Sequence, residues 1–423
     1  MAHQTSPKVN IAVSVVICAL FMIFAFLSNH KSWFQDMGAV WVAATFFAND
    51  MPEHMYDAPD QFFQGQMPDS WADAAFAAGA PNDVSLVPYV YPPLWAALIA
   101  PVTKISSAQA FFTLSQVFQL LALVGAMFLV RRIYKTGHPL AAFVAVSCAL
   151  LYLSLPSRVA LAQNQPQVLV TVLTIFAFAR YGAGRSLQAG FLLAMASAIK
   201  LAPAAFILIF LFDRDLRAAI TFFLSLVGFL MLSVVITGWD THTVFLERVQ
   251  QFDAHLVVNA YNHSLSVVWA QFSDWKTVSA ALPVEGPMLL LEQPKVTGMM
   301  LKVVFFGFCL TLLFRTRGMR PDMQLAIRLL GLGIMLGLTA PVGWVHYYLL
   351  PILLLPCLLN LVPKREAAIW IGIQLTFPHV LFIAQSFPSA NAFSVILPVA
   401  FWLSLFMRLC YLPQEGMKHP TTA

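Results

Sequence analysis

The feature that most constrains this chain is a long series of apolar runs interrupted by very few charges. Hydrophobic residues make up 60% of its 423 residues, charged residues make up 10%, and the mean hydropathy is +0.76. A water-soluble domain of this length needs far more surface charge, so the composition predicts an all-α, polytopic integral membrane protein. The net charge of +5 does not indicate nucleic acid, because the basic residues fall mostly in short loops between apolar runs.

Twelve apolar runs are candidates for membrane spans, and we expect a single domain, residues 1–423, built as a bundle of about twelve transmembrane helices. The runs are 9–27, 108–130, 139–155, 168–178, 187–199, 201–211, 218–237, 296–314, 323–340, 347–362, 367–384 and 392–409. Several are shorter than the roughly 20 residues that an upright span needs. The two runs that flank Lys200 are either half-helices that meet within the membrane or one kinked helix, and the sequence leaves both open.

Positive charge predicts which loops are cytoplasmic. Basic residues cluster at 131–135, 180–185, 214–217, 315–320, 364–365 and 408. If all of these are cytoplasmic, both termini of this multi-pass protein of the cell (inner) membrane are cytoplasmic too. The number of membrane crossings is even, as this orientation requires, only if the apolar segment 90–102 does not cross the membrane. Because that segment contains Pro92, Pro93 and Pro101, we expect an interfacial or re-entrant helix there.

On this orientation, two large segments lie outside the cytoplasm: a first loop at 28–107 with interfacial helices, and a second segment at 238–295. The stretch 29–91 has one basic residue, Lys31, and eight of the 19 acidic residues in the chain. The eight are Asp36, Asp50, Glu53, Asp57, Asp60, Asp69, Asp73 and Asp83. Asp36 directly follows the first apolar run, where a lipid head group would lie, and is therefore the best placed of them for chemistry.

Further polar patterns fall on the same expected face. Lys200 lies inside an apolar run, where a charge is costly enough to predict a function. The other candidate site residues on this face have side chains that can form hydrogen bonds or stack on rings. They are Gln163, Asn164, Gln165, Tyr89, Tyr91, Asn259, Asn262, His263, Trp344, His346 and Tyr347.

Taken in order, the acidic loop with Asp36, the tyrosines at 89 and 91, the amides at 163–165, Lys200 and the aromatic segment with His346 resemble glycosyltransferase family 87 of the GT-C superfamily. The resemblance implies a membrane glycosyltransferase that moves a mannose-like hexose or a pentose from a polyprenyl-phosphate donor. The acceptor would be a lipid-linked or cell-envelope glycan on the extracytoplasmic face. It also implies that Asp36 is the catalytic carboxylate and that Lys200 and His346 face the same cavity.

The side chains suit that chemistry. A carboxylate such as Asp36 can act as a general base, and His346 can share or relay the proton. Lys200 can pair with the donor phosphate in a region of low dielectric. We expect sugar hydroxyls to contact Gln163, Asn164 and Gln165, and rings or the isoprenoid to stack on Tyr89, Tyr91, Trp344 and Tyr347. Asn259, Asn262 and His263 are candidates to contact the acceptor.

Other interpretations remain open for the same residues. Asp36 can be a solvated loop acid, Lys200 can snorkel to the interface, and His346 can anchor a helix there. Asp213-Arg214-Asp215 has the form of a metal-binding motif, but its expected cytoplasmic position and a role in capping helices argue against metal. We expect no metal and no cofactor; the partners are donor, acceptor and membrane lipids. The alternative function is a transporter or flippase of a lipid-linked or anionic substrate.

Overall fold

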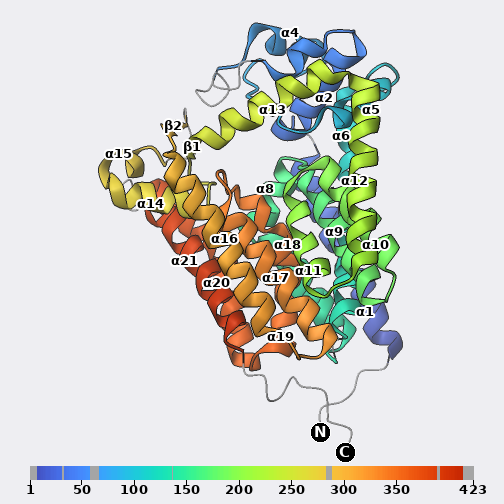
Figure 1. The fold of residues 1–423 in the computed structure, drawn as a ribbon, viewed down its shortest axis with the longest axis vertical. Coiled ribbons are helices and arrows are strands. Elements are labelled where there is room, and N and C mark those ends of the chain that lie inside the picture. The colour runs from blue at the N-terminus through green and yellow to red at the C-terminus, as the bar shows by residue number, and fades with distance from the viewer. Residues whose placement is uncertain are drawn as a thin grey trace, which may run out of the picture.

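The computed structural model describes residues 7–30, 33–57, 66–135, 137–282, 288–387 and 391–412 (Figure 1). Nearly all of this part of the chain is helical. Lys31 and Asp60 of the acidic stretch lie outside the described residues.

Seven helices within the described residues are long and apolar enough to cross a membrane, so the chain is an integral membrane protein. They are α1 (Pro7–Asn29), α6 (Ala108–Tyr134), α12 (Leu216–Thr237), α16 (Lys295–Arg315), α17 (Pro321–Thr339), α20 (Lys364–Ser386) and α21 (Phe393–Cys410). A pair bent by 63°, α7 (Leu140–Leu153) with α8 (Leu155–Ala162), would be an eighth span.

The other expected spans are helical but short. They form α9 (Gln167–Gly182), α10 (Ser186–Ile199), η2 (Ala202–Phe206) with α11 (Ile207–Phe212), and the series η3 (Val345–Tyr348), α18 (Leu349–Leu354), η4 (Leu355–Cys357) and α19 (Leu358–Leu361). Prolines at 351 and 356 divide the last run, because proline cannot donate the backbone hydrogen bond of a helix. A count of twelve full-length spans is therefore not confirmed, although all twelve apolar runs are helical.

The chain reverses direction at Lys200. Near the end of α9, the Tyr181 hydroxyl donates to Oδ2 of Asp213, the residue that follows α11, at 3.1 Å. Ser186, where α10 begins, donates to Asp215. The start of α10 and the end of α11 therefore lie together, so these are two short helices that meet at Lys200 rather than one kinked helix. The 14 residues of α10 rise about 21 Å, which is less than the thickness of a bilayer core.

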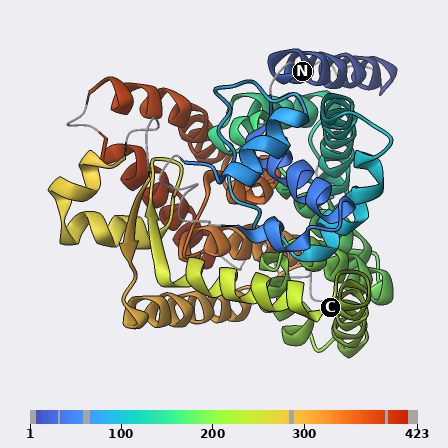
Figure 2. The ribbon, with the colours of Figure 1, turned by 90° about the horizontal axis from the view of Figure 1, so that it is seen from above.

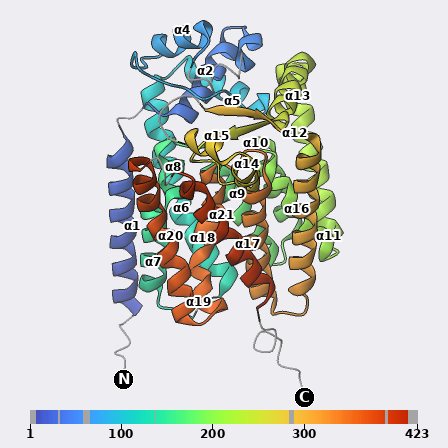
Figure 3. The same cartoon turned by 90° about the vertical axis from the view of Figure 1, so that its left-hand side faces the viewer.

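All the described spans form one bundle whose basic helix ends gather on one side. Helix α1 begins and α21 ends at the same end of the molecule (Figures 1 and 3). The helices α6, α9, α16 and α21 carry arginine in their last turns, where a cation also favours the helix dipole. These helix ends lie at the bottom of Figure 1, as expected from the loop charges.

A cap covers the opposite end of the bundle and has its own apolar core. It consists of α2 (Gln35–Ala48), η1 (Pro52–Tyr56), α4 (Asp69–Ala77) and α5 (Pro93–Thr103), with α13 (Trp239–Ala254) running along one side of it (Figure 2). The cap core includes buried Trp41, Trp71 and Phe112, and Phe245 of α13 joins it. Helix α5 has 11 residues and extends about 16 Å, so it is too short to span, as its prolines predict.

A small antiparallel sheet is the one described departure from an all-α architecture. Strands β1 (His255–Val258) and β2 (Leu289–Glu292) pair with His255 opposite Glu292. Between them lie α14 (Leu265–Ser273) and α15 (Trp275–Ala280). Four-residue strands that pair across more than thirty residues give no periodic signal in the sequence, so the all-α expectation missed them.

Candidate functional site

Asp36 lies in the first turn of α2, at the junction between the cap and the bundle. Its carboxylate is half-buried and interacts electrostatically with Lys200, Tyr91 and Tyr347. These partners come from three segments that are far apart in the sequence. The fold therefore gathers the predicted carboxylate, the predicted cation and two of the predicted aromatic residues into one site.

The surroundings of Asp36 suit a base that works near neutral pH. Burial raises the pKa of this carboxyl from its ordinary value to about 6, although the charge of Lys200 and a hydrogen bond from Gln165 lower it in part. A carboxylate with this pKa is ionised at neutral pH and is also a stronger base than a solvated aspartate. The neighbouring acids with exposed side chains, such as Asp69 and Asp73, lack such an environment.

Lys200 directly follows α10, and two aromatic rings lie close to its ammonium. Its Nζ is 4.2 Å from the centroid of the Tyr347 ring and 5.8 Å from that of Tyr91, both within the range of a cation–π interaction. No ion pair within 4.0 Å joins Lys200 to Asp36, and both residues are described. The ammonium and the carboxylate thus influence one another without direct contact, and the ammonium keeps its capacity to bind an anion.

His346 is the neighbour of Tyr347 in η3. Its imidazole is 6% exposed, and Nε2 has no hydrogen-bond partner among the described residues. Its ring meets that of Tyr347 edge to face, with centroids 5.1 Å apart. A buried ring nitrogen without a partner is uncommon and marks a position where a hydroxyl can bind.

The three amides at 163–165 occupy different environments. The Tyr91 hydroxyl donates to Gln165 Oε1 at 2.9 Å, and Gln163 Nε2 donates to Gln35 Oε1, beside Asp36, at 3.0 Å. Asn164 faces away toward α6, where its Nδ2 donates to the carbonyl of Phe112 at 3.0 Å. With φ of 48°, Asn164 also takes the left-handed conformation that asparagine tolerates.

Tyr89 supports the cap instead of joining Asp36. Its hydroxyl donates to the Pro92 carbonyl at 3.0 Å and accepts from the Ala96 backbone N–H at 3.1 Å. The ring is 2% exposed. These bonds fix the first turn of α5, and a role for Tyr89 in stacking on substrate remains a prediction.

The polar cluster at 259–264 holds the loop that precedes η3. The Asn262 amide donates to the Val257 carbonyl at 2.7 Å and accepts from the Gly343 N–H at 2.8 Å. The carbonyl of Gly343 in turn accepts from the His263 N–H at 2.8 Å. A Cβ at Gly343 would collide with the carbonyl oxygen of Gly337, so only glycine fits this close approach.

The rest of that cluster is engaged in the same way. Asn259 Oδ1 accepts from the Tyr261 N–H at 2.8 Å, and Trp344 pairs with Asn262 in an isolated bridge. The side chains of Asn259, Asn262 and His263 are therefore bonded to backbone groups of their own loop and of Gly343. Contact between the acceptor and these residues is still only a prediction.

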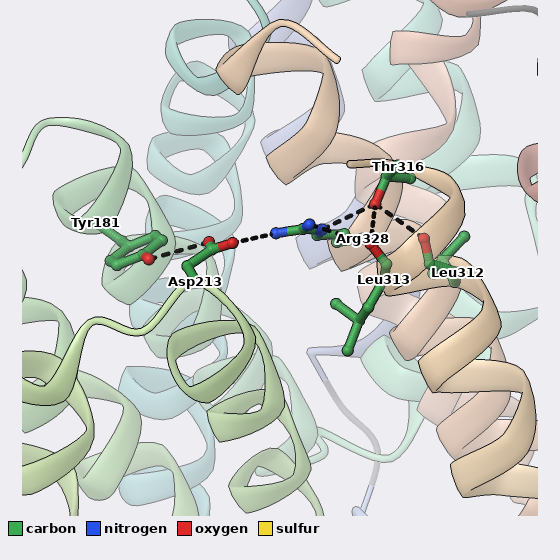
Figure 4. A network of polar contacts seen from close by, with 6 residues as sticks. All are labelled: Tyr181, Asp213, Leu312, Leu313, Thr316 and Arg328. Atoms are coloured by element: carbon green, nitrogen blue, oxygen red, sulfur yellow. Dashed lines mark hydrogen bonds and ion pairs between the residues drawn. The ribbon is translucent and has the colours of Figure 1, made fainter. Parts of the chain in front are cut away.

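The motif Asp213-Arg214-Asp215 has a structural role. Asp213 Oδ1 accepts from Nη1 of the buried Arg328 at 2.6 Å, and Arg328 Nε also donates to Thr316 Oγ1 at 2.9 Å (Figure 4). Asp215 caps α12 through the Ala218 N–H at 3.0 Å. This network joins α9, α11, α16 and α17 at the end of the bundle opposite the cap. Sequence reasoning missed Arg328, although a lone arginine inside an apolar run is a usable signal.

Metal ligands do not gather near the candidate site. Among the residues that the structure describes, no group of three or more His, Cys, Asp or Glu side chains is arranged to hold a metal ion.

The described helices form a membrane bundle that carries a half-buried carboxylate, a cation and an imidazole beneath the cap. The model of glycosyltransferase family 87 matches residues 89–341, more than half of the chain, and the chain belongs to that family. It is thus a membrane glycosyltransferase. A comparison with curated proteins found no match. The matched stretch contains Tyr91, Gln165 and Lys200 but neither Asp36 nor His346, which the fold brings beside them.

Proposed function

We propose that this glycosyltransferase moves a hexose or pentose from a polyprenyl-phosphate donor to a lipid-linked or cell-envelope glycan acceptor. The observation that carries the proposal is the meeting of Asp36 and Lys200 at the junction of the cap and the bundle. Such a transfer needs a base and a cation. Here the two groups lie in one site without neutralising one another by direct contact. A lipid-linked donor also suits a site built against membrane spans.

The reaction is a single displacement with inversion at the anomeric carbon. Asp36 accepts the proton of the acceptor hydroxyl while that oxygen attacks the anomeric carbon. The bond from this carbon to the phosphate oxygen breaks, and the electron pair leaves with the polyprenyl phosphate. The uncommitted Nε2 of His346 would hold the acceptor hydroxyl or relay the proton.

Lys200 would bind the phosphate of the donor. Close to the rings of Tyr91 and Tyr347, the ammonium is removed from most solvent, so its attraction to an anion is less screened than at the surface. The charge that develops on the leaving phosphate makes this interaction stronger in the transition state.

The proposed reaction is tested by its two products. Purified protein in lipid vesicles, given a polyprenyl-phosphate sugar and an acceptor lipid extract, should release polyprenyl phosphate in equal amount to the sugar transferred, and the new linkage should have the opposite anomeric configuration. Retention of configuration would exclude the single displacement.

We further propose that the cap is extracytoplasmic and that both chain ends are cytoplasmic. Asp73 and Arg317 are both exposed, Asp73 in the cap and Arg317 just after α16 at the opposite end. In intact cells, a membrane-impermeant thiol reagent should label the Asp73→Cys variant and not the Arg317→Cys variant. The five native cysteines are buried and give a low background. The reverse pattern would place the site on the cytoplasmic side.

The transfer rate should depend on the ionisation of Asp36. Since its pKa lies at about 6, protonation below that pH removes the base, and kcat/KM should fall about tenfold per pH unit on the acid side. Initial rates measured from about pH 4.5 to pH 8 give the pH at which this decline begins, which we call the acid limb of the rate profile. A rate that holds constant down to about pH 5 would show that the titrating group has the pKa of an ordinary solvated carboxyl and is not Asp36.

A further inference from the structure

We propose that Gln165 is a positioning residue for the transfer, whose side-chain amide is oriented by Tyr91 and holds the Asp36 carboxylate in place. This inference rests on the proposed function, because it requires Asp36 to be the base. It gives Gln165 a different role from the binding of sugar hydroxyls.

The orientation of the amide follows from its two neighbours. Tyr91 Oη donates to Gln165 Oε1 at 2.9 Å, with both side chains about 2% exposed or less. With its oxygen occupied, Gln165 presents Nε2, which is a donor, to the other side. An ionised carboxylate such as Asp36 can only accept, so the opposite orientation would place two acceptors against one another.

The backbone on both sides of this contact is fixed. Tyr91 is held through its carbonyl, which accepts from the Tyr56 hydroxyl at 2.7 Å. The Gln165 N–H donates to the Ala160 carbonyl at 2.9 Å, and the preceding Asn164 is bonded to α6. Each member of the series Tyr91, Gln165 and Asp36 is therefore supported by cap or bundle, which is what precise placement of a reacting group requires.

A second contact joins the same two segments. Gln163 Nε2 donates to Oε1 of Gln35, the residue before Asp36, at 3.0 Å. The loop between α8 and α9 is thus bonded to the start of α2 beside Asp36, and it carries Gln165, which also acts on that carboxyl. The contact of Gln163 with Gln35 forms within the protein and requires no sugar.

The charged and titratable groups that act on Asp36 come from each packed segment: Lys200 after α10, Tyr91 before α5, and Tyr347 in η3. Of these, Lys200 is the only basic group. Removing the Gln165 donor takes away one interaction that favours the ionised carboxylate and leaves Lys200 as the other. The acid limb of the rate should then move to higher pH.

The experiment compares the pH dependence of kcat/KM for the wild type, Gln165→Leu, Tyr91→Phe and Tyr89→Phe in the full-length protein. We expect Gln165→Leu to shift the acid limb upward by about one pH unit, so that the fraction of its plateau rate retained at pH 6 is about fivefold lower than in the wild type. Tyr91→Phe should shift the limb in the same direction by a smaller amount. Tyr89→Phe loses a buried hydroxyl of the same kind, but one bonded to α5, and should keep the wild-type limb.

Two results separate this inference from the proposed function. If Asp36→Asn is inactive but Gln165→Leu and Tyr91→Phe titrate like the wild type, Gln165 does not position the base, and the inference is wrong. If Asp36→Asn is active, the proposed base itself is wrong. Tyr91→Phe changes one atom and keeps the test decisive if Gln165→Leu does not fold. An equal shift in Tyr89→Phe would show a general loosening of the cap and would also overturn the inference.

Discussion

Asp36→Asn should reduce the rate of sugar transfer by a factor of about 10²–10⁴, which is the usual contribution of a positioned general base. Asparagine has nearly the same size as aspartate and keeps hydrogen-bonding capacity, but it cannot accept the proton of the acceptor. Donor binding and folding should therefore survive while kcat falls. Initial rates with labelled donor, together with a donor-binding measurement on the same purified sample, give the two quantities separately.

Asp69→Asn is the matched control for this change. Asp69 is also an acidic residue in the first turn of a cap helix, α4, but its side chain is exposed. We expect its transfer rate to stay within twofold or so of the wild type, as is usual for exposed positions. Asp36→Glu should keep little activity, because one additional methylene displaces the carboxylate. If Asp36→Asn turned over at nearly the wild-type rate, the general base would be a different residue, and His346 would be the next candidate.

Lys200→Ala should raise the KM for the donor about 10- to 100-fold, as expected from the loss of a hydrogen bond between charged groups. Lys200→Arg should recover part of the loss, because it restores the charge but not the shape of an ammonium. Steady-state kinetics at varied donor concentration separate this effect from kcat. Since Lys200 also lowers the pKa of Asp36, the acid limb of Lys200→Ala should move to higher pH.

Lys104→Ala provides the control for the lysine. Lys104 follows α5 in the cap and is exposed, away from the rings that hold Lys200. Its removal should leave the KM for the donor unchanged. An unchanged donor KM in Lys200→Ala as well would mean that Lys200 only reaches toward the membrane surface and binds no phosphate.

The sequence predicts the membrane bundle well because the hydropathy of each helix can be read from its own short stretch of residues. Each of the twelve apolar runs is helical, and the proline-containing segment 90–102 forms the short helix α5. What the apolar runs do not show is which of them are long enough to cross. The reversal at Lys200 brings Tyr181 into contact with Asp213, a residue 32 positions away, and no local pattern contains that information.

The site was partly predictable for the same reason. The isolation of Lys200 in an apolar run and the position of Asp36 after the first helix are visible in the sequence. The separate roles of Gln163, Asn164 and Gln165 are not, because they depend on partners as distant as Tyr91, 74 residues away. Asn259, Asn262 and His263 are candidate ligands in the sequence, and the sequence does not show that their side chains are bonded to backbone groups of residues 257–261.

The most direct measurement of the central claim is transfer of radiolabelled sugar by purified protein from two donors, a polyprenyl-phosphate sugar and the corresponding nucleotide sugar. We expect the wild type to label acceptor lipid from the polyprenyl-phosphate donor alone, and Asp36→Asn to label almost none from either. Label transferred from the nucleotide sugar would contradict the proposed donor. Movement of intact labelled donor across the vesicle membrane, without transfer to acceptor, would contradict the transfer reaction and indicate a transporter instead.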